Sequence, residues 1–264
     1  MAKVKPADDA DQNDGQKKRK KKKSGGWWET IRTVIYAVLA AVILRTVALE
    51  PFNIPSGSMI PTLMVGDYLF VSKYSYGYSK YSLPWSLPLF SGRILGGEPD
   101  RGDVAVFKLP RDNETDYIKR IVGLPGDRIQ VKDGVLYINE QAVERHRIED
   151  FTYIDKYGHS RTIDQYRETL PSGVSYNTLD ATSRGSLDNT QVYTVPSQHY
   201  FAMGDNRDNS LDSRVLSGVG FIPYENLVGR AEFIFFSTNG TAEMWEIWKW
   251  GKTTRGERLF TGVN

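Results

Sequence analysis

The chain has 264 residues, of which 25% are charged and 40% hydrophobic, enough for one sizeable globular domain with appendages, and this excludes a disordered or fibrous protein. The net charge of +2 hides an asymmetry: residues 1–26 carry nine Lys or Arg against four Asp, so the remainder is mildly acidic and gives no case for nucleic acid binding. The absence of cysteine excludes disulfides, a thiol nucleophile and thiolate metal sites.

The N-terminal region combines a basic tail with an apolar segment. Lys17–Lys23 is a run of seven basic residues, typical of a disordered, solvated tail. From Trp27 the sequence is apolar, and as a helix Ile31–Leu49 would span roughly 28 Å, close to the hydrocarbon thickness of a bilayer. We expect one spanning anchor over 27–50, with the N-terminus cytoplasmic by the positive-inside rule and everything after Pro51 exported. A cleavable signal peptide is the alternative, because Thr46-Val47-Ala48 is an acceptable small-residue cleavage pattern.

Beyond the anchor, short runs of alternating apolar residues bounded by turns predict a mainly β fold. Twenty-four Gly, twelve Pro and fifteen Tyr agree with it. The expected strands are 68–73, 103–109, 117–122, 128–131, 135–138, 191–194, 200–203 and 229–236, with a turn at Asp133-Gly134. The domain plan is a disordered basic tail (1–26), an anchor helix (27–50), a catalytic β core (51–140 and 191–240), an inserted β-rich excursion (141–190) and a Trp-rich tail (241–264). The three Trp of that tail suit either ordinary packing at the sheet edge or contact with a membrane interface.

The segment just after the anchor, Ile54-Pro55-Ser56-Gly57-Ser58-Met59-Ile60-Pro61, offers a candidate nucleophile. Two prolines and a glycine predict a rigid extended turn, and two hydroxyls lie between the prolines. One serine could attack a carbonyl while Ser56 and the Ser58 backbone N–H receive the oxyanion. A generic turn without chemistry is the alternative from this segment alone.

A base would have to be something other than histidine, because His146, His159 and His199 sit in no recognisable catalytic motif. Lys119 lies in an apolar strand, where alternation turns it to the face of Tyr117 and Ile121. Burial disfavours the charged ammonium and lowers the pKa, so a desolvated Lys119 could accept a proton. The alternative is a surface lysine beside Arg120.

The segment 204–214, GDNRDNSLDSR, is dense in hydrogen-bonding groups. It lacks the central Gly and terminal Glu of a calcium loop. A buried polar network is the better interpretation, with Asp212 paired to Arg214 and Ser210 orienting a nearby donor or base.

Together these segments resemble bacterial type I signal peptidases, the serine-lysine enzymes that remove signal peptides from exported proteins. The resemblance runs through PSGSMIPTL at 55–63, GDYLFVSKYSYG at 66–77, RGDVAVFKLP at 101–110, YIKRIVGLPGD at 117–127 and GDNRDNSLDSR at 204–214. It implies an antiparallel β-sheet catalytic domain with one N-terminal transmembrane helix.

The resemblance also implies the role of each site residue. Ser58 would be the nucleophile, Lys119 the general base, Ser56 an oxyanion donor and Ser210 a hydroxyl that positions the Lys119 amine, with Asp212 and Arg214 as a supporting ion pair. Pockets for small residues at substrate positions −1 and −3 would be lined by Phe52, Ile54, Met59, Leu63, Val106 and Ile118. Such an enzyme cuts after Ala-x-Ala type sites and holds its substrate as an added strand.

The resemblance predicts a monomeric enzyme of the bacterial cytoplasmic membrane, with its catalytic domain on the periplasmic side. Its partners would be signal peptides and the lipid bilayer, and it would need no metal or cofactor. Two alternatives remain open: a dedicated processing peptidase for one exported substrate, and an inactive β-domain that binds precursors without cutting them. A self-cleaving repressor-type protease is disfavoured by the anchor and by the lack of a DNA-binding module.

Overall fold

The computed structural model describes residues 1–2, 27–83, 86, 90–155 and 157–263. The chain divides by its internal contacts into two units, residues 1–41 and 42–264. The basic tail expected over 1–26 lies outside the described residues, apart from the first two.

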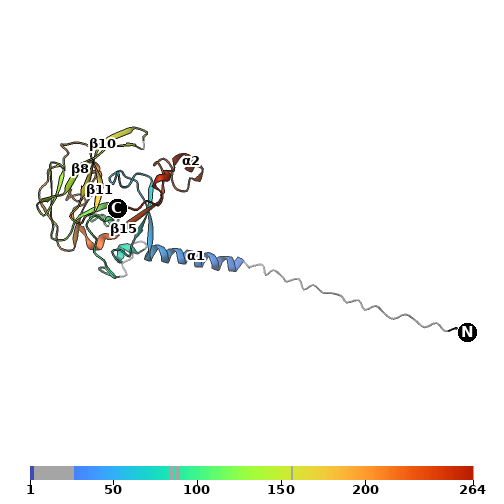
Figure 1. The fold of residues 1–264 in the computed structure, drawn as a ribbon. Helices are drawn as coiled ribbons and strands as arrows, with labels where there is room; N and C mark the ends of the chain where they lie inside the picture. The colour runs from blue at the N-terminus through green and yellow to red at the C-terminus, as the bar shows by residue number, and fades with distance from the viewer. Residues whose placement is uncertain (3–26, 84–85, 87–89, 156, 264) are drawn as a thin grey trace. The chain divides into compact units, whose positions relative to one another are not determined.

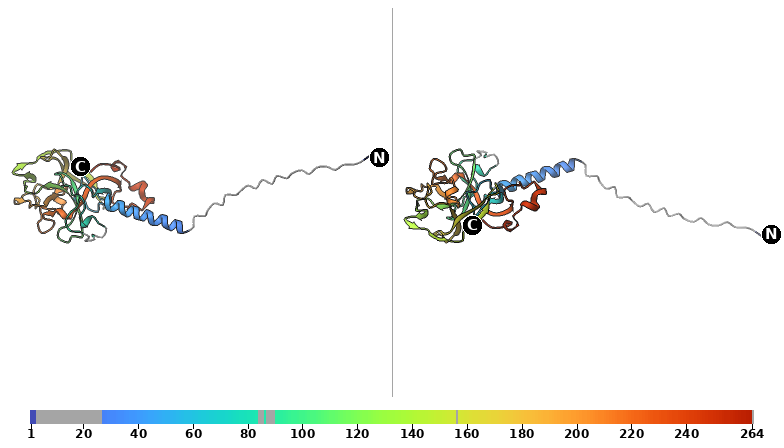
Figure 2. Two further views of the ribbon diagram at one scale, coloured as in Figure 1. Left: turned by 90° about the horizontal axis from the view of Figure 1, so that it is seen from below. Right: turned by 90° about the horizontal axis from the view of Figure 1, so that it is seen from above.

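One long helix, α1 (Trp27–Val47), occupies the region where the anchor is expected (Figures 1 and 2). Its described apolar side chains from Val34 to Val42, among them Ile35, Val38 and Leu39, are about half exposed or more. Within the part of the chain that the structure describes, no helix is both long enough and apolar enough to cross a membrane. The expected helix is present, and its role as a spanning anchor stays a prediction.

The largest sheet has seven strands in the order β1-β2-β15-β3-β4-β13-β14, and all of its pairings are antiparallel. Its strands are rich in Val, Ile, Phe and Tyr, which favour a pleated, half-buried surface. Their bounds are β1 (Leu49–Asn53), β2 (Asp67–Ser72), β3 (Val104–Lys108), β4 (Asp116–Gly123), β13 (His199–Met203), β14 (Ile222–Pro223) and β15 (Leu227–Ser237).

A second sheet of four strands has the order β12-β5-β6-β7. Its strands are β5 (Arg128–Lys132), β6 (Val135–Ile138), β7 (Gln141–Ala142) and β12 (Tyr193–Thr194). The β5–β6 hairpin turns at Asp133 and Gly134, which both have positive φ (47° and 75°), the combination that Asp-Gly hairpin turns favour. The turn expected at this dipeptide is therefore confirmed.

A third sheet lies within the inserted excursion, where β10 pairs with β8, β9 and β11. Its strands are β8 (Glu144–Arg147), β9 (Phe151–Ile154), β10 (Ser160–Thr169) and β11 (Ser175–Asp180). Figure 1 shows β8, β10 and β11 side by side. The remaining helical turns are η1 (Lys80–Ser82), η3 (Arg207–Asn209), η4 (Tyr224–Asn226), η5 (Ile247–Lys249), α2 (Trp250–Thr253) and η6 (Gly256–Arg258).

The three tryptophans of the Trp-rich tail differ in their surroundings. The Trp250 ring packs against Phe236 of β15, with ring centroids 4.8 Å apart. Trp245 and Trp248 are largely exposed. The structure thus places one Trp against the sheet and leaves two in solvent.

The mainly β class and each of the eight expected strands are confirmed, with bounds that differ by at most two residues. Sequence patterning missed β1, since Glu50 and Pro51 interrupt its alternation. It also gave no bounds for the strands of the excursion, because strands such as β8 (sequence ERHR) are largely exposed and carry no apolar period.

Candidate active site

Ser58 lies in the irregular segment that joins β1 to β2. The segment starts where Ile54 N–H donates to Asp67 O at 2.8 Å, and its far end forms a turn in which Leu63 N–H donates to Met59 O at 2.9 Å. The Ser58 side chain is only 8% exposed, whereas Ser56 is exposed, and their hydroxyl oxygens lie 3.4 Å apart. The proline-flanked turn therefore buries one hydroxyl and leaves its neighbour in solvent.

Lys119 extends from the middle of β4, where it is paired with Ala105 of β3. Its side chain is 3% exposed, which excludes the surface lysine that was the alternative. Its Nζ donates to Ser58 Oγ at 2.8 Å and to the Ile118 carbonyl at 2.8 Å. Ser58 and Lys119, 61 positions apart in sequence, are thus in direct contact.

Burial lowers the pKa of Lys119 from 10.5 to about 8, because the desolvated ammonium loses its hydration. The negative charges of Asp212 and Asp205 act in the opposite direction but do not cancel this effect. A lysine in this environment is substantially neutral at mildly alkaline pH. It can therefore accept a proton from the hydroxyl that it touches.

Segment 204–214 lies beside this pair. Asp212 and Arg214 form a buried, two-point ion pair with both N···O distances at 2.9 Å, and Asp212 also accepts the Gly204 N–H at 3.0 Å. Burial raises the pKa of Asp212, but the Arg214 guanidinium and the neighbouring hydrogen-bond donors together lower it overall, so the carboxylate stays charged. The network expected from this segment is present.

Ser210 is buried against Gly204, so closely that a Cβ added to that glycine would lie 2.2 Å from Ser210 Oγ. Only glycine permits this approach. Among the described residues the Ser210 hydroxyl makes no hydrogen bond of normal geometry, although it lies close enough to Asp212 to help lower the pKa of that carboxyl. Lys119 Nζ donates instead to Ser58 and to the Ile118 carbonyl. The role expected for Ser210, positioning of the lysine amine, stays a prediction.

Arg120 contributes to the site in a way that sequence reasoning missed. It is fully buried and makes a two-point ion pair with Asp205, at 2.9 and 2.8 Å, and Thr62 Oγ1 donates to the same carboxylate at 2.6 Å. These bonds tie β4, the nucleophile segment and segment 204–214 together. The available signal was an arginine within an otherwise apolar strand, since a buried arginine requires a buried acid.

A cavity of about 530 Å³ opens in front of Ser58 and Lys119. Four of the residues expected to line a substrate pocket do line it, namely Phe52, Ile54, Val106 and Ile118. The structure adds residues that sequence reasoning missed: Thr115, Asp116, Tyr117, Asn209 and Leu211. Met59 and Leu63 do not line the cavity, because both are fully buried in the core cluster that also contains Ile54.

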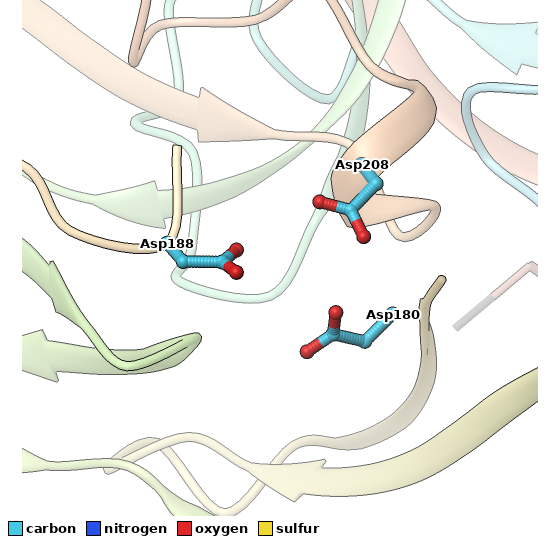
Figure 3. A group of neighbouring side chains, drawn as sticks. All are labelled: Asp180, Asp188 and Asp208. Atoms are coloured by element: carbon cyan, nitrogen blue, oxygen red, sulfur yellow. The ribbon is translucent and has the colours of Figure 1, made fainter. Parts of the chain in front are cut away.

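Among the described residues, one cluster of three carboxylates could offer oxygen ligands to a cation (Figure 3). Asp180, Asp188 and Asp208 each bring one oxygen within 4.8 Å of the others, and burial raises the pKa of Asp188. Each carboxylate already binds a donor: Asp188 and Asp208 accept backbone N–H groups, and Asp180 accepts from Arg145 at 2.6 Å. This arrangement fits a polar network around the end of β11.

The chain matches the family model described as signal peptidase, peptidase S26, over residues 27–236. It is 45% identical to signal peptidase I of Rickettsia conorii over 214 residues, covering 78% of each chain. Identity to signal peptidase I of Rickettsia typhi is also 45%, over 78% of this chain and 79% of the relative. A crystal structure of a signal peptidase I from Enterococcus faecalis matches at 29% identity with a TM-score of 0.30, covering 51% of this chain and 97% of the other. The resemblance carried by the five motifs is thus confirmed, and the chain belongs to the signal peptidase family, peptidase S26.

Proposed function

We propose that this protein is a serine endopeptidase that removes signal peptides from preproteins, with Ser58 as nucleophile and Lys119 as general base. The observation that carries the proposal is the 2.8 Å contact between Lys119 Nζ and Ser58 Oγ, made by a buried lysine whose pKa is lowered to about 8. A purely structural lysine has no need of such a contact. Membership of the signal peptidase family supplies the class of substrate.

In the first half of the reaction, neutral Lys119 takes the Ser58 proton as Ser58 Oγ attacks the carbonyl carbon of the residue at position −1. The Ser56 hydroxyl and the Ser58 N–H stabilise the oxyanion of the tetrahedral intermediate. The peptide C–N bond then breaks, and Lys119 returns its proton to the leaving amine. The products of this half are the free mature N-terminus and a signal peptide joined to Ser58 as an ester.

In the second half, Lys119 is neutral again and takes a proton from water as that water attacks the ester carbonyl. The Ser58–acyl bond breaks, and the proton passes back to Ser58 Oγ. Asp212 and Arg214 keep segment 204–214 in place beside the lysine throughout. We retain for Ser210 the role of positioning the amine.

Substrate binding is supported by an open strand edge at the cavity. β4 is paired with β3 from Asp116 to Arg120, but its pairing with β13 begins only at Arg120. Residues 116–119 therefore have no strand on that side among the described residues, and they line the cavity. An extended peptide adds there as a further strand, with its small side chains directed into the apolar pockets.

We place the protein at the bacterial cytoplasmic membrane as a monomer, with the catalytic domain on the periplasmic side. The support is the basic run Lys17–Lys23, which favours a cytoplasmic N-terminus, and the apolar, exposed side chains of α1. Anchoring raises the effective concentration of substrates whose own apolar segments lie in the bilayer.

The test is cleavage of a model preprotein with an Ala-x-Ala site, in detergent, by the wild type and by Ser58→Ala and Lys119→Ala. We expect the wild type to cut after the final Ala and both variants to be inactive while still folded by circular dichroism. A matched control is Lys132→Ala, a largely exposed lysine on β5, which should cut normally. Full activity in either the Ser58 or the Lys119 variant would overturn the assignment of these two residues, the Ser58–Lys119 dyad, as nucleophile and base. An inert wild type would favour a peptidase dedicated to one substrate or a protein that only binds precursors.

A further inference from the structure

Glu168, an acid in the inserted excursion, is fully buried although it takes no part in the chemistry above. Its carboxylate accepts two bonds from Arg207, with Nη1 at 2.8 Å, and a third from the Tyr176 hydroxyl at 3.0 Å. A buried charge is stable only when it is paired and hydrogen-bonded in this way. Glu168 is therefore a fixed attachment point between the third sheet and Arg207.

Arg207 belongs to the segment that lies beside the dyad, at the start of η3. It is 4% exposed, and its own carbonyl accepts Arg214 Nη2 at 2.6 Å. Burial lowers the pKa of Arg207, but the charge and hydrogen bonds of Glu168, together with the nearby Tyr176 and Asp205, raise it overall, so the pair remains ionic. The segment is thus held on one side by Arg214 and on the other by Glu168.

The residue before Arg207 holds the backbone of the nucleophile. Asn206 N–H donates to the Ser58 carbonyl at 3.1 Å, and Asn206 Nδ2 donates to the Gly57 carbonyl at 2.9 Å. The position of Ser58 therefore depends on the position of Asn206. Because Asn206 adjoins Arg207, the position of Ser58 depends also on the Glu168–Arg207 ion pair.

Tyr176 on β11, which donates to Glu168, also contacts β4, the strand that carries Lys119. The Arg120 guanidinium lies over the Tyr176 ring, 4.1 Å from its centroid, and Arg120 directly follows Lys119 in β4. The hydroxyl of the same Tyr176 donates to Glu168. The excursion thus contacts the segment that holds Ser58 through Glu168, and the strand that carries Lys119 through Tyr176.

We infer that Glu168 is a positioning residue for the cleavage reaction, acting through Arg207 and Asn206 to hold Ser58 against Lys119. The inference rests on the proposed function and gives the inserted sheet a role in catalysis. A displacement of the nucleophile of about 1 Å is enough to lower the rate about 100-fold. The substrate cavity is lined mainly by residues 52–58, 106 and 115–119, so substrate binding should change little.

The test compares Glu168→Gln with Glu144→Gln, which removes an exposed acid on the adjacent strand β8 of the same sheet. We expect Glu168→Gln to lower kcat about 10- to 100-fold with KM within about threefold of wild type, and Glu144→Gln to leave both unchanged. Labelling of Ser58 by a small serine-acylating reagent should slow by a similar factor. A merely structural role would lower the melting temperature of the folded protein without this loss of kcat.

Two further variants keep the test decisive if Glu168→Gln does not fold. Glu168→Asp retains the charge but withdraws the carboxylate by one methylene, and it should show an intermediate kcat. Asn206→Ala leaves the ion pair intact and should lower kcat as Glu168→Gln does, while combining it with either Glu168 substitution should add little, because both act on the same contact.

The outcomes separate this inference from the proposed function. If the wild type neither cuts preproteins nor is labelled at Ser58, the proposed function fails. If the wild type cuts, and folded Glu168→Gln or Glu168→Asp retains the wild-type kcat and labelling rate, then Glu168 has no positioning role and the proposed function still stands. Fully additive effects of Glu168 and Asn206 substitutions would likewise overturn the inference.

Discussion

Replacing Lys119 by Met should remove the activity and yet stabilise the fold at neutral pH. Lys119 is 3% exposed, and its pKa in the folded protein is about 8 against an ordinary value of 10.5. Below pH 8 the ammonium is buried in the folded state but solvated in the unfolded state. The difference of about 2.5 pH units corresponds to a destabilisation of roughly 3.4 kcal/mol.

Methionine has a similar length and carries no charge, so Lys119→Met removes this term. It also removes the donors to Ser58 Oγ and to the Ile118 carbonyl, at a cost of about 1 kcal/mol each. The net expectation at pH 6.5 is a gain of about 1 kcal/mol in the free energy of unfolding. The sign reverses at high pH, because the folded wild type binds fewer protons than the unfolded chain between pH 8 and 10.5, and its stability rises over that interval. Above pH 10.5 the variant should be about 2 kcal/mol less stable than wild type.

The assay is urea unfolding of the wild type and the variant at pH 6.5 and near pH 10.5, followed by tryptophan fluorescence. A matched control is Lys132→Met, whose exposed side chain should give the same difference at both pH values. The decisive quantity is the change in the stability difference between the two pH values, about 3 kcal/mol. If that difference does not change with pH, Lys119 is not desolvated in the way described here.

The lowered pKa of Lys119 also predicts that kcat/KM rises about tenfold between pH 7 and pH 9, with a midpoint near 8, since only the neutral amine accepts a proton; a flat profile would exclude a lysine base. Arg120→Ala should cost about 3–5 kcal/mol in urea unfolding, because it leaves Asp205 buried and unpaired; a cost below 1 kcal/mol would show that the carboxylate finds solvent. Ile54→Ala should cost about 2–4 kcal/mol and let precursors with Val at position −1 be cut, because it enlarges the cavity; retained rejection of Val would place the −1 pocket elsewhere.

Much of the site could be predicted from local sequence. The alternation of residues around Lys119 predicted the face of the strand on which it lies, and the prolines around Ser58 predicted a rigid turn. Both properties depend on neighbours within a few residues. The family resemblance then joined Ser58 to Lys119, which no local pattern could do. The turn at Asp133-Gly134 and the main-sheet strands β2, β3, β4, β13 and β15 could likewise be predicted, because apolar alternation and turn residues are local signals.

Only the tertiary structure decided which groups are desolvated and which buried charges meet. Glu168 and Arg207 lie 39 positions apart, and Arg120 and Asp205 lie 85 apart, so no period or spacing relates them. The excursion looked like a polar insertion because its strands have few apolar positions, and its contact with Arg207 depends on one buried acid. The lowered pKa of Lys119 has the same origin, because it results from burial that several distant segments produce together. The sequence of the strand predicted the face on which Lys119 lies, but it could not predict that water is excluded from that face.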